Sequence, residues 1–126
     1  MADHGIVHVE FPATEPKAAA GFYTELFGWK HEEFQGGYWM FDTGNNSGGG
    51  YNPVGTSGLF EVKPGEVLVY VNTDDIEASL AKAEQLGGKT IAPKTPIPGM
   101  GYYAVFSDPT GNKVGLYTND AQAPAA

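Results

Sequence analysis

Residues 7–29 read VHVEFPATEPKAAAGFYTELFGW, and residues 67–89 read VLVYVNTDDIEASLAKAEQLGGK. The two stretches align without a gap at an offset of 60 positions, which places Val7 on Val67. A repeat of this length is one supersecondary unit used twice, because each unit needs a neighbour to bury its apolar face. The repeat therefore predicts a tandem fold.

Both repeats open with a predicted strand that leads into a predicted helix. Apolar, β-branched residues that end at a proline indicate a strand at Ile6–Phe11, and apolar residues at helical spacing then continue to Gly28. Short apolar runs parted by glycine predict three further strands in each unit. The predicted strands are Ile6–Phe11, Trp29–Phe34, Tyr38–Thr43 and about Gly49–Pro53, then Val67–Asn72, Lys89–Ala92, Tyr102–Phe106 and Lys113–Thr118.

The later halves of the units also match, now at an offset of 64 positions. Gly37-Tyr38-Trp39 aligns with Gly101-Tyr102-Tyr103. The larger offset indicates extra residues in the second unit, where residues 93–99 are too rich in proline for a helix or a central strand. We predict one domain over residues 1–126, with unit one at about 5–53, a connector at about 54–65, unit two at about 66–118 and a frayed tail at 119–126.

Composition excludes several classes of partner. Seven basic residues against fifteen acidic ones give a net charge of −8, whereas nucleic acids and anionic membranes attract basic patches. No apolar run is long enough to cross a membrane, and no signal-like segment opens the chain. The absence of cysteine excludes disulfides and thiolate chemistry. We expect no nucleic-acid or membrane partner and a cytoplasmic location.

Three segments carry a resemblance to a known family. They are Pro16 through Phe22-Tyr23 to Leu26-Phe27-Gly28, Asp74-Asp75-Ile76 through Leu86-Gly87-Gly88, and Asp108-Pro109-Thr110-Gly111-Asn112. In order and spacing they resemble the vicinal-oxygen-chelate superfamily of glyoxalase I, bleomycin-resistance proteins and extradiol dioxygenases, over nearly all of residues 5–118. Gly37-Tyr38-Trp39-Met40 is similar to a single-domain glyoxalase-like subgroup. The resemblance implies an α+β fold, with tandem βαβββ units forming two curved sheets around a cavity, and a homodimer.

The same resemblance implies where metal ligands would lie, on the first and fourth strands of both units. Carried over by position, they fall at His8, Leu68 and Gly115, and by the internal offset near Tyr51. A catalytic divalent ion needs about three His, carboxylate or thiolate ligands. Leu68 and Gly115 have no donor atom, and a neutral tyrosine is a poor ligand. We therefore expect no metal and no cofactor, with a divalent ion at an atypical site as the alternative.

His8 keeps its chemistry without a metal. A neutral imidazole offers one donor and one acceptor and titrates near physiological pH. Glu10 shares its face of the predicted strand, so that the pair is a candidate catalytic base and orienter. The alternative is a histidine that is only hydrogen-bonded in its strand or only anchors a ligand.

Aromatic residues supply further candidates for a ligand site. Aromatic walls suit planar or apolar ligands, although core packing is the better explanation for any single aromatic residue. The candidate ligand-binding residues are His8, Trp39, Tyr51, Leu68, Tyr70, Tyr102 and Phe106. We predict a protein that binds a small, planar or apolar molecule in a cavity without a catalytic metal. The alternatives are a lyase or isomerase with His8 as general base or with an atypical metal site, and a structural module whose cavity is filled by side chains.

Overall fold

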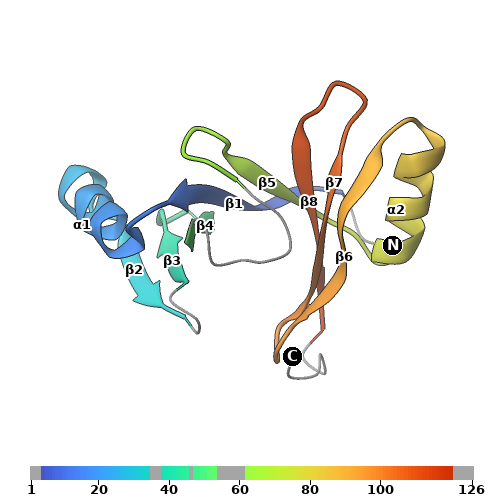
Figure 1. Ribbon diagram of the computed structural model, residues 1–126. Helices are drawn as coiled ribbons and strands as arrows, with labels where there is room; N and C mark the ends of the chain where they lie inside the picture. Colours follow the sequence, from blue (N-terminus) through green and yellow to red (C-terminus); the bar gives the residue numbers. More distant parts are fainter. Residues whose placement is uncertain (1–3, 35–37, 46, 54–61, 121–126) are drawn as a thin grey trace. The chain divides into compact units, whose positions relative to one another are not determined.

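The computed structural model describes residues 4–34, 38–45, 47–53 and 62–120, and these form two βαβββ units (Figure 1). This confirms the tandem fold predicted from the repeat. The first unit contains β1 (Ile6–Ala13), α1 (Pro16–Phe27), β2 (Lys30–Glu33), β3 (Trp39–Asp42) and β4 (Gly48–Pro53). The second contains β5 (Leu68–Asn72), α2 (Ile76–Gln85), β6 (Lys89–Ile97), β7 (Gly101–Ser107) and β8 (Lys113–Asn119). In the described part of the chain, neither helix is long and apolar enough to cross a membrane.

Chain contacts divide the molecule at the first strands of the two units. One compact body covers His8–Leu68, and the other joins residues 4–7 to residues 69–120. The start of the chain is held in the second body because the Asn72 amide donates to the Gly5 carbonyl at 2.9 Å. The predicted connector and tail lie mostly outside the described residues.

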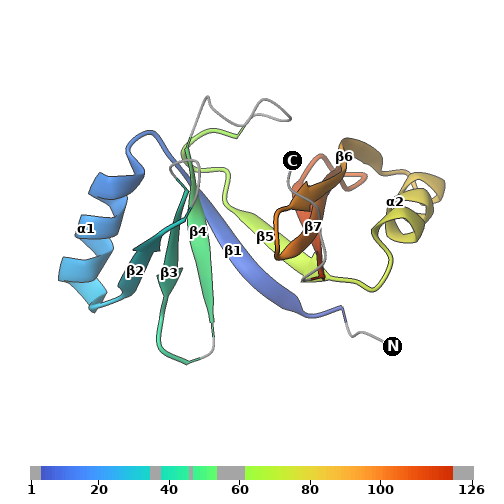
Figure 2. The same cartoon turned by 90° about the horizontal axis from the view of Figure 1, so that it is seen from below.

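In the first unit the strands run in the order β2-β3-β4-β1, and Figure 2 shows α1 alongside β2, β3 and β4. Strands β1 and β4 are parallel, and the other neighbours are antiparallel. The core lies between the sheet and α1, where Phe41 and Tyr51 are buried. Trp29 stacks on Phe41 with ring centroids 4.8 Å apart and on Tyr23 at 5.0 Å. Such offset aromatic contacts add to the free energy gained from burial.

Residues on β1 alternate between two faces of this sheet. Phe11 and Ala13 pack in the core under α1. Successive strand residues point to opposite faces, and His8 and Glu10 therefore lie on the face away from α1. The strand predicted at Ile6–Phe11 extends to Ala13 in the structure, because Pro12 continues the parallel pairing with Asn52.

In the second unit the order is β5-β8-β7-β6, with α2 beside β6 and β7 (Figure 2). Ile76 and Leu80 of α2 pack on Ala104 and Leu116. The predicted strand at Lys89–Ala92 continues to Ile97. Prolines at 93 and 96 are accommodated because β6 is an edge strand whose pairing with β7 shifts register twice.

The strand pairing sets the true correspondence between the units. Phe11 pairs with Tyr51 in the first unit, whereas Val71 pairs with Leu116 in the second. Tyr51 therefore corresponds to Leu116, an offset of 65 rather than the 64 predicted from sequence. A shift of one residue moves a side chain to the other face of a strand, so this correction changes which residues belong to a site.

Candidate functional site

Four polar side chains form a hydrogen-bonded network on the face of the first sheet away from α1. His8 Nε2 lies 2.8 Å from the hydroxyl of Tyr38, and that hydroxyl donates to Glu10 Oε2 at 2.7 Å. Asn52 Nδ2 donates to the other carboxyl oxygen of Glu10 at 3.1 Å. We call His8, Tyr38, Glu10 and Asn52 the polar network. Its members come from β1, from the residue before β3, and from β4.

The hydrogen bonds of the network run in one direction. A tyrosine hydroxyl has one proton, and Tyr38 gives it to Glu10. The contact between His8 and Tyr38 therefore requires a proton on His8 Nε2, which donates to the hydroxyl oxygen. In the neutral imidazole this leaves Nδ1 as the acceptor nitrogen.

Gly50 allows Tyr38 to reach its partners. A Cβ atom at position 50 would stand 2.1 Å from the hydroxyl oxygen of Tyr38, which is far inside van der Waals contact. Gly50 faces the same side of the sheet as Glu10, its pairing partner on β1. A side chain at position 50 would therefore occupy the space that the end of the Tyr38 side chain fills.

Burial keeps the imidazole of His8 uncharged. Desolvation lowers the pKa of His8 from 6.5 to about 4. Glu10 is 6% exposed and accepts hydrogen bonds at both carboxyl oxygens. At neutral pH His8 is therefore a polar but uncharged group. Its basicity is far below that of an efficient general base, whose pKa lies near the working pH.

Trp39 and Tyr51 do not join this network, because they lie on the other face of the sheet. Both pack in the core beneath α1, and Tyr51 is 0% exposed. Burial raises the pKa of Tyr51 to about 12, and its hydroxyl contacts His31 Nε2 at 2.9 Å. Neither residue therefore lies on the face of the polar network; Tyr51 is a core residue, whereas Trp39 is only partly buried and its ligand role stays a prediction. The structural reason is that they pair directly across β3 and β4 and share the helix side.

In the second unit, Tyr102 and Phe106 likewise lie on the helix side of the sheet. Both pack against the cluster that contains Ile76 and Leu80 of α2. They therefore do not share the face of Leu68 and Tyr70, and their predicted ligand role stays untested. They share a face with Ala104 on β7, whereas Tyr103 and Val105 alternate to the opposite face.

Leu68 and Tyr70 do lie away from α2. Val71 packs on the α2 side, so its alternating neighbour Tyr70, and Leu68 with it, take the opposite face of β5. Tyr70 is 7% exposed, and its ring lies against Gly115, where a Cβ atom would stand 2.3 Å from Cδ2. The second unit thus repeats the arrangement of a tyrosine seated on a glycine, and the ligand role of both residues stays a prediction.

The corrected offset changes the fourth position at which the resemblance places a metal ligand. The fourth-strand position that corresponds to Gly115 is Gly50, not Tyr51, because Gly50 and Gly115 pair with Glu10 and Tyr70 respectively. Two glycines and Leu68 provide no side-chain donor, and a chelated ion does not fit these positions. Over the ranges that the structure describes, no three His, Cys, Asp or Glu side chains are grouped to hold a metal ion.

Sequence reasoning missed Tyr38, Asn52 and Gly50. A usable signal was present, since Trp39 and Phe41 alternate with Tyr38 and Met40. Assigning the larger apolar pair to the helix side would have placed Tyr38 beside His8. The internal match of Tyr38 with Tyr102 indicated the wrong face of the sheet, because that alignment was one residue out of register.

A family model described as Glyoxalase/Bleomycin resistance protein/Dioxygenase superfamily matches residues 5–116. The chain belongs to this superfamily. The match covers both βαβββ units, which confirms the resemblance seen in the sequence.

Similar proteins include longer ones. One is CFP32 of Mycobacterium bovis, which is named as a glyoxylase. It is 31% identical to this chain, and the match covers 86% of this chain and 43% of CFP32. The anthracycline biosynthesis protein DnrV of Streptomyces peucetius is 32% identical over 75% of this chain and 39% of its own. The chain thus spans less than half of these curated relatives. The crystal structure of methylmalonyl-CoA epimerase from Mycobacterium tuberculosis shares the fold, with a TM-score of 0.64, 17% identity, and coverage of 100% of this chain and 93% of that one.

Proposed function

We propose that this glyoxalase-superfamily protein binds a small, uncharged molecule at the polar network of the first unit, without a chelated metal. The observation that carries the proposal is the chain from His8 through Tyr38 to Glu10, completed by Asn52. Ligand sites characteristically combine apolar walls with a few fixed polar groups that orient the ligand. Burying polar groups costs free energy unless they are hydrogen-bonded, so four polar side chains buried together favour a role in binding.

The charge of the site favours a neutral ligand. The imidazole of His8 is uncharged at neutral pH, and the buried carboxyl of Glu10 accepts a hydrogen bond from Tyr38. The whole chain has a net charge of −8. An anionic ligand would meet no compensating cation within the network. A relative named for anthracycline biosynthesis supports a role with a small organic molecule.

An enzyme of the lyase or isomerase type, with His8 as general base, is the weaker candidate. A base whose pKa is about 4 has little driving force for removing a proton near neutral pH. The same imidazole remains a good hydrogen-bonding group. The lowered pKa therefore favours anchoring of a ligand over proton abstraction.

Native mass spectrometry of the purified protein tests the proposal. A small molecule of defined mass should co-purify, and Tyr38→Phe and His8→Gln should release it. Tyr102→Phe, on the α2 side of the second sheet, is the matched control and should retain it. Release by the control alone, or stoichiometric zinc, nickel, manganese or iron in elemental analysis, would contradict metal-free binding at this network.

The proposal includes a homodimer, which the superfamily resemblance implies. Sedimentation velocity at micromolar concentration measures the oligomeric state directly. A dimer is the expected species, and a monomer at that concentration would overturn this part of the proposal.

A further inference from the structure

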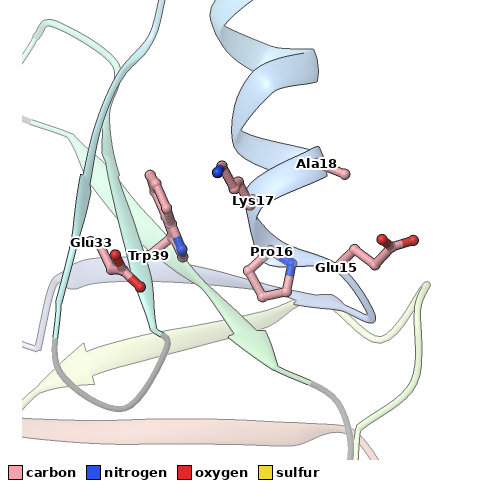
Figure 3. A pocket seen from close by; sticks show the side chains of 6 residues that line it. All are labelled: Glu15, Pro16, Lys17, Ala18, Glu33 and Trp39. Atoms are coloured by element: carbon pink, nitrogen blue, oxygen red, sulfur yellow. The ribbon is translucent and has the colours of Figure 1, made fainter.

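A pocket lies on the other face of the first sheet from the polar network, at the start of α1 (Figure 3). It has a volume of about 680 Å³. Its lining residues are Glu15, Pro16, Lys17, Ala18, Glu33 and Trp39. All of them belong to the first unit, and none is a member of the polar network. The volume lies within the range of small-molecule sites.

The pocket lies where the first turn of α1 faces strands β2 and β3. Trp39 pairs with Tyr51 on one side and with Glu33 on the other. Tyr51 is fully covered, whereas Trp39 is only partly buried and lines the pocket beside Pro16. The large flat side chain of a tryptophan therefore remains partly accessible beside the first turn of the helix.

Opposite charges line this pocket without neutralising each other. In Figure 3 the Lys17 side chain reaches from α1 toward the strands that carry Glu33 and Trp39. Lys17 and Glu33 both lie in the part of the chain that the structure describes, and they form no ion pair with each other, for which the nitrogen and oxygen atoms would have to lie within 4.0 Å. A ligand with both charges would satisfy both groups at once.

We propose that this pocket binds a small zwitterion of the betaine or amino-acid type. The ammonium group lies over the indole of Trp39 beside Glu33, because tryptophan is the best aromatic partner for a cation. The carboxylate of the ligand pairs with Lys17. Glu15 lies at the rim and points away from Trp39 (Figure 3).

The test uses three probes that differ in charge and share a trimethyl head. Glycine betaine carries both charges, choline lacks the carboxylate, and 3,3-dimethylbutyrate replaces the ammonium nitrogen by carbon. The readout is the indole ¹H–¹⁵N signal of Trp39, assigned with Trp39→Phe. The chain has two tryptophans, and Trp29, stacked inside the core, serves as the internal reference.

Glycine betaine should shift the Trp39 signal with an affinity in the millimolar range, roughly fivefold tighter than either partial probe. Glu33→Gln should weaken betaine and choline about two- to fivefold but leave 3,3-dimethylbutyrate unchanged. Lys17→Gln should weaken betaine and 3,3-dimethylbutyrate but not choline. Lys30→Gln and Glu32→Gln, exposed on β2, are the matched charge controls.

Equal binding of betaine and either partial probe would overturn the zwitterion assignment. Absence of any shift at Trp39, or equal effects of the matched controls, would overturn the site itself. Tyr38→Phe should leave the betaine titration unchanged, because Tyr38 lies on the opposite face of the sheet. A failure of betaine binding at this pocket is therefore distinguishable from a failure of ligand binding at the polar network.

Discussion

Tyr38 is seated on Gly50, with its hydroxyl oxygen 2.1 Å from the place where a Cβ atom at position 50 would lie. That contact places the hydroxyl between His8 and Glu10. A glycine on β4 is therefore a structural requirement of the polar network on β1. Tyr70 and Gly115 have the same relationship in the second unit.

Gly50→Ala should displace Tyr38 and destabilise the protein by about 1–3 kcal/mol, the usual cost of overpacking. Urea unfolding followed by circular dichroism measures the change. Gly21→Ala is the control, because nothing lies within 4 Å of a Cβ atom there and alanine is the better helix former. The control should be neutral or stabilising, and an equal loss in both variants would contradict the seating of Tyr38 on Gly50.

Gly115→Ala should act in the second unit in the same way. A Cβ atom would stand 2.3 Å from the Tyr70 ring, and the expected loss of stability is again about 1–3 kcal/mol. The double variant Gly115→Ala/Tyr70→Leu tests the cause, since a smaller, flexible side chain relieves the clash. It should be no less stable than Tyr70→Leu alone, and a fully additive loss would show that the clash lies elsewhere.

Tyr38→Phe should cost about 1–3 kcal/mol, because it removes a hydrogen-bond partner from both His8 and Glu10 while keeping the ring. Tyr102→Phe removes a tyrosine hydroxyl on the α2 side of the second sheet and should change stability by no more than about 0.5 kcal/mol. The two variants can be compared in one thermal denaturation series. A loss that is larger for position 102 would refute the importance assigned to the network.

His8 should remain neutral down to mildly acidic pH, and the stability of the protein should fall on acidification. The pKa of His8 is lowered from 6.5 to about 4 in the folded protein, so the unfolded chain binds more protons between these values. The stabilising contribution is present above pH 6.5 and is lost as the pH falls from 6.5 through 4. The full loss is about 3 kcal/mol.

Imidazole chemical shifts followed by NMR measure that titration, and chemical unfolding at several pH values measures the stability. His8→Gln should flatten this part of the stability profile, because the glutamine side chain does not titrate. A pKa near 6.5 in the folded protein would show that His8 is solvated rather than buried.

Much of the fold could be predicted because its signals are local or repeat along the chain. The offset of 60 aligned β1 with β5 and both helices correctly. The later strands were predicted in number and approximate position. Their register was wrong by one residue, since Tyr38-Trp39 and Tyr102-Tyr103 match in sequence while their pairing partners differ. No local pattern reports a one-residue slip in an aromatic-rich strand.

The candidate site was only half predictable for the same reason. His8 and Glu10 were placed together because they alternate on one short strand. Trp39, Tyr51, Tyr102 and Phe106 were predicted to line a ligand cavity, yet they lie on the helix sides of their sheets, where Trp39 lines the pocket at the start of α1. Tyr38 and Asn52 were missed, because they reach Glu10 from residues 28 and 42 positions away.

The sequence by itself determined the tandem βαβββ plan, the family, and the absence of donor atoms at Leu68 and Gly115. These follow from residue identity and periodicity along the chain. Only the tertiary structure decided that Gly50 replaces Tyr51 in the correspondence, that Tyr38 joins His8 to Glu10, and that Trp39 opens onto a pocket beside Lys17. The physical reason is that strand register is set by hydrogen bonding and packing between distant segments, and a shift of one residue reverses every side chain.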